Sequence, residues 1–260
     1  MINQLSKEAT PPELAAFPWS AFPEGIVVAA DTGTPTSKTI CLVEGAAPEF
    51  ALGMIQRKGQ GHVLQKNALG LATELGFAAG FLADPMAFFK KPLQTIFHPV
   101  STPMQAQGMA VLKNSGEKDA ILQQFETFAK PWPIKQQLLT NALTVLDEMV
   151  TNACYNAPFA KQKQVVSRSL RVDLKAQEYA NVFWGVSSEK IVVGCIDPFG
   201  ALVIPDLLTR LIKSLQQGMD STLNRGHGGA GIGFRMIVDY AASLLVAVQP
   251  GKYTAIVAAF

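Results

Sequence analysis

The chain has 260 residues, of which 48% are hydrophobic and 16% are charged, and its formal net charge is +2. This length suits two domains that each bury a core, and the composition excludes an intrinsically disordered chain. The small net charge excludes the strongly basic balance that is typical of proteins that bind nucleic acids or anionic membranes.

Cysteine spacing and apolar segments indicate the compartment. Cys41, Cys154 and Cys195 lie far apart and include no C-x-x-C pair, so we expect neither a disulfide framework nor a zinc site. The N-terminal sequence MINQLSKEATPPE lacks the basic start and apolar run of a secretion signal. The most apolar segment, 75–83, is shorter than the about 20 residues that cross a bilayer. We therefore expect a cytoplasmic protein with no membrane partner.

Residues 1–98 are expected to form a small α+β domain to which the sequence assigns no role. Its predicted elements are a proline-dotted arm over 1–24, strands over 25–30, 39–44 and 50–56, a helix over 62–83, and a linker over 90–103. The helix has two interpretations. Its apolar face packs on the strands of its own domain, which we favour, or it packs against a second copy in a homodimer.

The segment DTGTPTSKT (31–39) has some features of a phosphate-binding P-loop, since it follows a predicted strand and contains G-x-x-x-x-K-T. Ser37, however, occupies the position of the second glycine, and a strand is predicted where the motif needs a helix. Without a helix N-terminus there is no fan of N–H groups for the phosphates. We interpret this segment as a polar hairpin turn, and an enzyme that uses it as the less favoured alternative.

Residues 99–260 are expected to form a second domain in which helices alternate with hairpins. Strands are predicted over 104–112, 179–187, 190–197, 242–249 and 253–260, and helices over 117–129, 134–157, 205–218 and 234–242. This order predicts an α+β fold. In its two-layer C-terminal domain, a mixed, mostly antiparallel sheet carries helices on one face.

The sequence RGHGGAGIGFR (225–235) has a glycine density that lets a backbone approach a ligand closely. From its first glycine it matches the dinucleotide fingerprint G-x-G-x-x-G. That motif requires a buried strand directly before it, and the residues before this segment are polar and turn-like. It also matches G-x-G-x-G through Gly229, Gly231 and Gly233. Glycines followed by the predicted helix 234–242 would offer free backbone N–H groups to an anion, and we favour this interpretation.

Two further groups of residues carry polar chemistry. Glu148, Asn152 and Asn156 follow an i, i+4, i+8 spacing on one side of the long predicted helix, away from its apolar stripe. A carboxylate and an amide oxygen one turn apart suit a magnesium site and proton transfer. The alternative is a solvated helix face, and it is the favoured interpretation when this motif is considered by itself. Asp197, in CIDPFGAL (195–202), either marks a chain reversal or accepts a hydrogen bond from a ring amine.

In chain order these pieces read E-x-x-x-N on a helix, D-x-x-G after a strand and G-x-G-x-G before a helix. Together they resemble the GHKL ATP-binding superfamily, which includes gyrase B subunits, heat-shock ATPase chaperones and histidine kinases. Within it, residues from about 100 to 260 look most like the small anti-sigma-factor serine kinases. The resemblance implies a histidine kinase-like ATPase fold, ATP and Mg²⁺ as cofactors, and a role in signal transduction with an anti-anti-sigma-like or sigma-like protein partner.

The resemblance also implies a role for each matching residue. Glu148 would orient or deprotonate the attacking hydroxyl or water, and Asn152 would bind magnesium. Asp197 would accept a hydrogen bond from the adenine amine, with Thr254 supporting the ring through water and Gly200 letting the backbone pass close to it. The remaining candidates for binding the nucleotide, under a lid over 203–228, are Asn156, His227, Gly229, Gly231 and Gly233.

Two departures from the family pattern bear on catalysis. Phe199 occupies a position usually held by glycine, and Asn156 replaces the usual histidine of the helix motif E-x-x-x-N-x-x-x-H. We therefore expect an ATP-binding regulatory protein of one of two kinds. The first is a serine/threonine protein kinase of the anti-sigma-factor type, and the alternative is a nucleotide-sensing module that binds a protein without catalysis.

Overall fold

A computed structural model of the chain describes residues 27–30, 39–43, 62–65, 71–84, 106–162, 164, 166–186, 190–217 and 230–260. The chain divides into two compact units, Met1–Pro103 and Met104–Phe260. The division falls at the end of the proline-containing segment 90–103.

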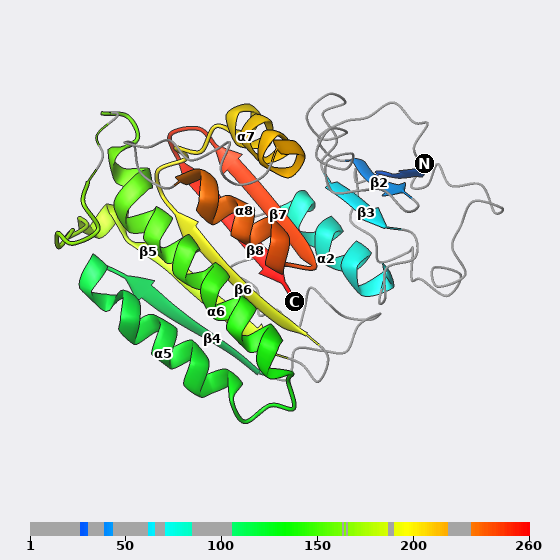
Figure 1. Cartoon of the computed structure of the whole chain (residues 1–260), viewed down its shortest axis with the longest axis horizontal. Coiled ribbons are helices and arrows are strands. Elements are labelled where there is room, and N and C mark those ends of the chain that lie inside the picture. The colour runs from blue at the N-terminus through cyan, green and yellow to red at the C-terminus, as the bar shows by residue number, and fades with distance from the viewer. Residues whose placement is uncertain are drawn as a thin grey trace. The chain divides into compact units, whose positions relative to one another are not determined.

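The first unit contains a three-stranded parallel sheet and a helix. Its elements are β1 Val27–Ala30, β2 Thr39–Val43, β3 His62–Gln65 and α2 Leu71–Ala83, with the strands in the order β1-β2-β3 (Figure 1). Ile40 of β2 lies opposite Val28 on one side and His62 on the other. Helix α2 contacts β2 and β3, and its Leu75 and Phe81 side chains are fully buried. Apolar contact between helix and sheet therefore forms the core of this unit.

Two expectations for this unit are wrong. Residues 62–65 form β3 instead of the first turn of a helix, because pairing with β2 satisfies their backbone groups, and the helix begins only at Leu71. The polar hairpin turn expected over 31–39 is also wrong, because β1 and β2 are parallel and a hairpin joins antiparallel strands. The arm 1–24, the strand 50–56 and the linker 90–103 lie outside the described residues.

The second unit is built on a five-stranded antiparallel sheet. Its strands are β4 Ala106–Leu112, β5 Ala180–Val186, β6 Ile191–Asp197, β7 Ser243–Gln249 and β8 Tyr253–Ala259. Their order is β4-β5-β6-β8-β7, so the expected hairpins β5–β6 and β7–β8 are both present. All pairings between these strands are antiparallel, without the parallel pairing that a mixed sheet would contain. The expected α+β class is confirmed.

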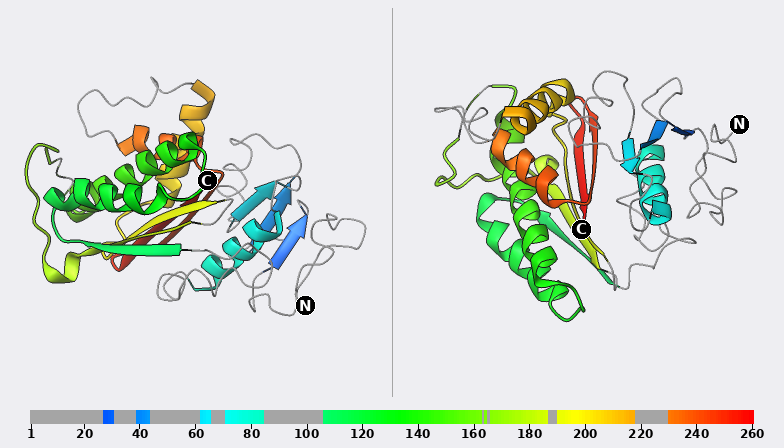
Figure 2. Two further views of the ribbon diagram at one scale, coloured as in Figure 1. Left: turned by 90° about the horizontal axis from the view of Figure 1, so that it is seen from below. Right: turned by 45° about the vertical axis from the view of Figure 1, so that its right-hand side comes forward.

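Helices cover one face of this sheet. They are α5 Lys118–Ala129, α6 Gln136–Thr151, α7 Ile204–Gln217 and α8 Ala230–Tyr240, with short turns at Ser115–Glu117, Asn152–Asn156, Ala157–Phe159 and Ala176–Glu178. Figures 1 and 2 show α5, α6 and α8 lying side by side on the same face, with α7 beside α8. The second unit is therefore a two-layer structure.

Helix α6 lies over the centre of the sheet because one side of it is apolar. Its buried apolar side chains recur every three or four residues and are Leu139, Ala142, Val145, Leu146, Met149 and Val150. They pack toward β6 and β8, which are central strands. Between α5 and the sheet, the rings of Phe125 and Trp184 pack with their centroids 5.9 Å apart. The position of α6 is thus fixed by the core of the unit.

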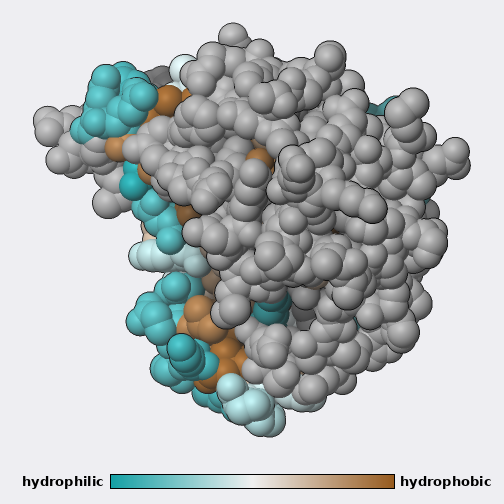
Figure 3. Space-filling view, turned by 90° about the vertical axis from the view of Figure 1, so that its right-hand side faces the viewer, coloured by the Kyte–Doolittle hydropathy of each residue, from teal (hydrophilic) through white to brown (hydrophobic). Residues whose placement is uncertain are grey.

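The surface of the described residues is mixed in character. The large hydrophobic side chains that remain exposed are Met109, Val111, Leu170, Val203 and Tyr240. On the face drawn in Figure 3, the described residues present hydrophilic groups interspersed with smaller apolar areas. Within the described ranges, every helix is too short or too polar to cross a bilayer.

Two glycines with left-handed backbones allow a test of the turn that closes β7 and β8. Gly200 has φ +56° and Gly251 has φ +71°. A methyl group on Gly200 would overlap the carbonyl oxygen of Gln249, whereas one on Gly251 would meet open space. We predict that Gly200→Ala lowers the free energy of unfolding by about 2 to 4 kcal/mol, and Gly251→Ala by about 1 kcal/mol. Equilibrium urea unfolding measures both, and equal losses would contradict the packing of Gly200 on the turn.

Candidate functional site

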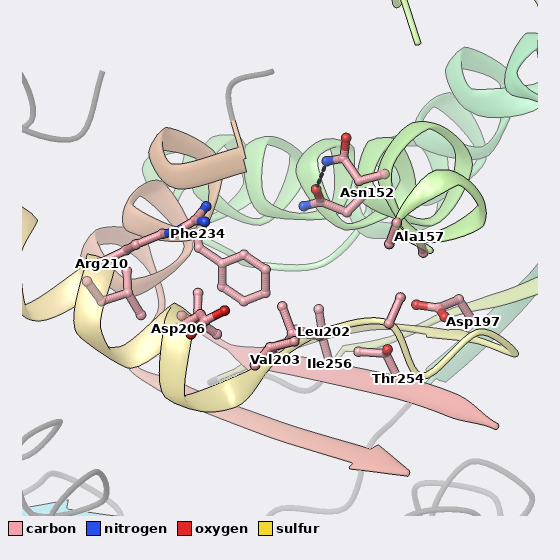
Figure 4. Close-up of a pocket in the computed structure, with 15 residues that line it drawn as sticks. Asn152, Ala157, Asp197, Leu202, Val203, Asp206, Arg210, Phe234, Thr254 and Ile256 are labelled. Atoms are coloured by element: carbon pink, nitrogen blue, oxygen red, sulfur yellow. Dashed lines mark hydrogen bonds between the residues drawn. The ribbon is translucent and has the colours of Figure 1, made fainter. Parts of the chain in front are cut away.

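A cavity of about 310 Å³ opens between the sheet and the helices at the carboxyl end of β6. Its walls come from the turn after α6, from β6 and β8, and from α7 and α8 (Figure 4). Its polar lining consists of Asn152, Asn156, Asp197, Asp206, Arg210 and Thr254. Much of the remaining wall is apolar and includes Leu202, Leu207, Phe234 and Ile256. An apolar wall with a few converging polar groups is the usual composition of a small-molecule site.

The side chains of Glu148, Asn152 and Asn156 form a hydrogen-bonded chain, here called the polar ladder. Nδ2 of Asn152 donates to Oε1 of Glu148 at 3.0 Å. Nδ2 of Asn156 donates to Oδ1 of Asn152, and Figure 4 marks this second bond with a dashed line. Asn152 and Asn156 line the cavity. The i, i+4 spacing seen in the sequence therefore produces direct contacts, and the ladder runs from the last full turn of α6 to the cavity wall.

The backbone under the polar ladder is not the straight α-helix expected over 134–157. Helix α6 ends at Thr151, and the next five residues form a π-helical turn in which the N–H of Ala157 donates to the carbonyl of Asn152. A 3-10 turn follows, and its Pro158 has no N–H with which to continue the helical pattern. π-helical turns are rare in proteins, and those that occur are often located at functional sites.

Glu148 is largely withdrawn from solvent. Its side chain is 12% exposed, so the alternative of a solvated helix face is wrong for this residue. Burial raises the pKa of the Glu148 carboxyl, while the positive charge of Arg168 and the hydrogen bond from Asn152 counteract that effect. Nη2 of Arg168 lies 3.9 Å from Oε2 of Glu148. The carboxylate thus has a separate polar partner on each oxygen.

The glycine-rich segment reaches the same place through α8. This helix begins at Ala230, so Gly231 and Gly233 lie in its first turn and not in a loop before a helix starting at 234, as expected. Gly233 packs directly against Glu148, because any side chain there would overlap the carboxylate. Position 233 is thus a glycine because α8 lies close to the Glu148 side chain, and not because the backbone needs an unusual conformation there. His227 and Gly229 lie outside the described residues.

Asp197 forms the polar end of the cavity opposite the ladder. It is the last residue of β6, lies opposite Thr254 on β8 and is 8% exposed. Its Oδ1 accepts a hydrogen bond of 2.9 Å from the N–H of Phe199. Burial raises the pKa of Asp197 to about 6, although the amides of Phe199 and Gly200 and the nearby Thr254 counteract it. The buried hydroxyl of Thr254 lies in the cavity wall beside Asp197.

The structure explains why position 200 is a glycine, which could not be inferred from the sequence. Its left-handed backbone brings it against the β7–β8 turn, where its carbonyl accepts a hydrogen bond of 3.2 Å from the N–H of Gly251. This contact fixes the chain that leads from Asp197 into the cavity wall. Its expected role, letting the backbone pass close to a bound ring, remains a prediction.

Sequence reasoning missed several residues that the structure brings to the site. Asp206 and Arg210 lie four residues apart on α7 and line the cavity, whereas the sequence analysis named only the expected lid over 203–228 and no residue within α7. Phe234 of α8 also lines it (Figure 4). Arg168 reaches Glu148 from the irregular segment before β5. The polar positions of an amphipathic helix could have indicated Arg210, but no pattern marks Arg168.

Comparisons with known proteins add no assignment. No protein-family model matches the chain, and a search of curated proteins finds no significant match. In the described part of the chain, no group of three or more His, Cys, Asp or Glu side chains is arranged to hold a metal ion.

A double-mutant cycle tests the contact between α6 and α8. We predict that Gly233→Ala lowers the free energy of unfolding by about 1 to 3 kcal/mol, because the new methyl group displaces the Glu148 carboxylate. Glu148→Ala removes the overlapping atoms, so the second substitution should cost much less in that background. Urea unfolding of the four proteins measures the coupling. Additive losses would show that the two residues do not touch.

Proposed function

We propose that this chain is an ATP-binding regulatory protein whose second unit, Met104–Phe260, is a GHKL-type nucleotide-binding domain. One observation supports the proposal above all. Asn152, Asp197 and Thr254, from three distant parts of the sequence, line one cavity, and the polar ladder connects that cavity to the start of α8. These are the segments that the motif resemblance assigns to a single nucleotide.

The end of the cavity near Asp197 suits a purine base. Its apolar walls, which include Ile256 and Leu202, can cover the faces of a heterocyclic ring. A buried carboxylate beside them accepts a hydrogen bond from an exocyclic amine, as adenine presents. Guanine presents a carbonyl oxygen at the same ring position and would be repelled. The cavity volume of about 310 Å³ falls at the lower end of the range of about 300 to 1,000 Å³ for ligand sites.

The end near the polar ladder suits the phosphates. The first backbone N–H groups of α8, which include that of Gly231, have no partners within the helix and favour an anion. Arg210, which lines the cavity from α7, adds a positive charge. Magnesium bound between the phosphates and the side-chain oxygen of Asn152 would neutralise the charge of the transferred group.

Glu148 is the residue we assign to catalysis. Phosphoryl transfer depends mainly on positioning and charge neutralisation, and a carboxylate that accepts the proton of the attacking hydroxyl completes the site. In this proposal the chain is a cytoplasmic serine/threonine protein kinase of the anti-sigma-factor type. Its substrate is a regulatory protein, anti-anti-sigma-like or sigma-like, and a homodimer is one of its candidate assemblies.

A second function, nucleotide sensing without catalysis, is favoured by one contact. Oδ1 of Asn152, the atom that would bind magnesium, already accepts a hydrogen bond from Asn156. A metal at this oxygen would share it with the side-chain N–H of Asn156, which makes the oxygen a weaker metal ligand. The two functions differ in turnover. ATP consumption by the wild type that is lost in Glu148→Gln supports the kinase, whereas ATP binding without turnover supports the sensing module.

Calorimetric titration with ATP and Mg²⁺ tests the proposal. We predict that Asp197→Ala weakens ATP binding by about 10- to 100-fold, because a hydrogen bond to a charged group contributes about 1.5 to 3 kcal/mol. The same substitution should reduce the preference of the wild type for ATP over GTP. Asp173→Ala, which removes an exposed carboxylate paired with Arg171, is the matched control and should bind as the wild type. Absence of ATP binding by the wild type would end the proposal.

The raised pKa of Asp197 predicts a pH dependence. Protonation removes the charged acceptor, so ATP affinity relative to Asp197→Asn should fall as the pH drops through about 6. Protonation of the phosphates affects both proteins alike, so their ratio isolates the carboxyl group. Stability changes with the opposite sign. In the folded state Asp197 keeps a proton that the unfolded chain releases near pH 3.8. The contribution of this carboxyl group to the free energy of unfolding therefore declines as the pH rises from about 4 to about 6. A flat affinity ratio would contradict the assignment.

A further inference from the structure

One stretch of the second unit concentrates positive charge. Between Glu148 and Asp173 the chain has four basic residues, at irregular spacing, and no acidic residue, so this stretch carries a charge of +4. The four are Lys161, Lys163, Arg168 and Arg171. The chain has 22 basic and 20 acidic residues, so the other 18 basic residues leave the rest of it with a charge of −2. Residues 161–171, here called the basic segment, therefore differ in charge from the remainder of the protein.

The described cations of the basic segment are exposed to solvent. The Arg168 and Arg171 side chains are 54% and 66% exposed, and Lys161 is exposed and forms no ion pair with another described residue. Arg171 pairs at 3.0 Å with Asp173, whose side chain is 67% exposed. Ion pairs between exposed side chains are weak, so a carboxylate of a binding partner can replace them at little cost.

An apolar side chain projects among these charges. Leu170 is 58% exposed, and it lies between Arg168 and Arg171 in the sequence. Its N–H donates to the carbonyl of Ser167 at 3.0 Å, so residues 167–170 form a turn. An exposed leucine flanked by two arginines suits a partner that offers carboxylates together with an apolar side chain.

The backbone of the basic segment is held in place over its C-terminal half. The hydroxyl group of Tyr155, in the π-turn, donates to the carbonyls of Arg168, at 3.1 Å, and Leu170, at 3.0 Å. Directly after the segment, the N–H of Val172 donates to Oγ of Ser115 at 2.9 Å. A partner that binds here therefore meets a backbone that is already ordered, which reduces the entropic cost of binding.

The basic segment also adjoins the cavity. Ala157 and Ala160, which lie just before it, line the cavity, and Nη2 of Arg168 lies 3.9 Å from Oε2 of Glu148. In Figure 1 the segment connects α6 to β5 and projects from the end of the second unit at which α6 ends. A protein bound to the basic segment would therefore lie next to the polar ladder, to which the proposed function assigns the phosphates.

We propose that the basic segment is a docking surface for an acidic, partly apolar segment of the regulatory protein on which this chain acts. Carboxylates of the partner pair with Lys161 and Arg171, and an apolar side chain of the partner packs on Leu170. The opposite charges also speed the association of the two proteins. That the partner is a substrate for phosphorylation rests on the proposed function, whereas the binding chemistry rests on the basic segment alone.

The composition of the basic segment favours a protein over other anionic partners. Sites for single-stranded nucleic acids combine cations with aromatic side chains on which the bases stack, and residues 161–171 contain no aromatic residue. Basic clusters that bind anionic lipids lie beside a membrane span or on an amphipathic helix. The described residues of the basic segment form turns and irregular backbone instead. An acidic protein segment is therefore the partner that this chemistry fits best.

Fluorescence anisotropy of a labelled peptide, titrated with the full chain, tests the proposal. The probe peptide alternates glutamate, leucine and serine, and a second peptide carries glutamine in place of glutamate. We predict that Lys161→Gln combined with Arg171→Gln weakens binding of the glutamate peptide by about threefold to tenfold, because two exposed charges are lost. Binding of the glutamine peptide should be weaker in the wild type and should not respond to this double substitution. Leu170→Ser should weaken binding of both peptides, since both contain leucine.

The matched control combines Lys130→Gln with Lys135→Gln. These two lysines are exposed and precede α6, whose 16 residues span about 24 Å and separate them from the basic segment. The control removes the same charge from the protein, and it should bind the glutamate peptide as the wild type does. Circular dichroism verifies that both double variants are folded.

Three results would overturn the proposal. In the first, the wild type binds the glutamate peptide no more tightly than the glutamine peptide. In the second, both double variants lose equal affinity, so that net charge alone explains the binding. In the third, oligothymidylate or vesicles of phosphatidylcholine and phosphatidylglycerol bind more tightly than the glutamate peptide and lose affinity in Lys161→Gln with Arg171→Gln. The surface would then serve a nucleic acid or a membrane.

The binding test needs no nucleotide, so its result is separate from the fate of the proposed function. If the wild type fails to bind ATP in calorimetry while peptide binding depends on the basic segment, the docking surface stands and the kinase assignment falls. If ATP binds but the glutamate peptide does not, the docking surface falls and the nucleotide site stands. If the γ-phosphoryl group of ATP is transferred to the serine of the peptide, leaving ADP, Lys161→Gln with Arg171→Gln should raise the KM for the peptide by about threefold to tenfold. The KM for ATP should not change.

Discussion

The packing of α6 on the centre of the sheet is the interaction on which the candidate site depends. The apolar side of this helix, including Val145, Leu146 and Met149, is buried against β6 and β8, and each fully buried side chain of this size contributes about 1.5 to 3 kcal/mol. Glu148 and Asn152 belong to the same helix and its extension. Their position above Asp197 therefore follows from the packing of the core.

The site also shows two carboxyl groups whose surroundings differ in kind. Asp197 has backbone partners that belong to its own chain reversal and cannot leave without unfolding the turn. Glu148 has side-chain partners, one of them an arginine that is more than half exposed. Burial raises the pKa of both, and the partners of Glu148 can be exchanged by rotation of side chains. This difference suits a fixed acceptor for ligand recognition and an adjustable group for proton transfer.

Much of the second unit could be predicted from the sequence because its signals are local. Alternating and apolar runs predicted all five strands, and the hairpin turns predicted the antiparallel pairing of β5 with β6 and of β7 with β8. The first unit was harder to predict. Residues 62–65 form a strand because they pair with β2, and pairing between segments distant in sequence leaves no periodic signal. The start of α8 was misplaced for a related reason. Glycines disfavour helix in isolation, but contact with Glu148 requires one at position 233.

The π-turn at the end of α6 has a consequence for how this architecture tolerates changes in chain length. A π-turn accommodates one residue more than an α-helical turn does, and each residue of an α-helix advances the direction of side chains by about 100°. Loss of one residue between 152 and 156 would let α6 continue as an uninterrupted α-helix. The side chains that follow the deletion in this helical segment would then point in new directions. The Tyr155 hydroxyl would lose its hydrogen bonds to the backbone carbonyls of Arg168 and Leu170. The arrangement is therefore specified by the spacing of the chain as much as by its side chains.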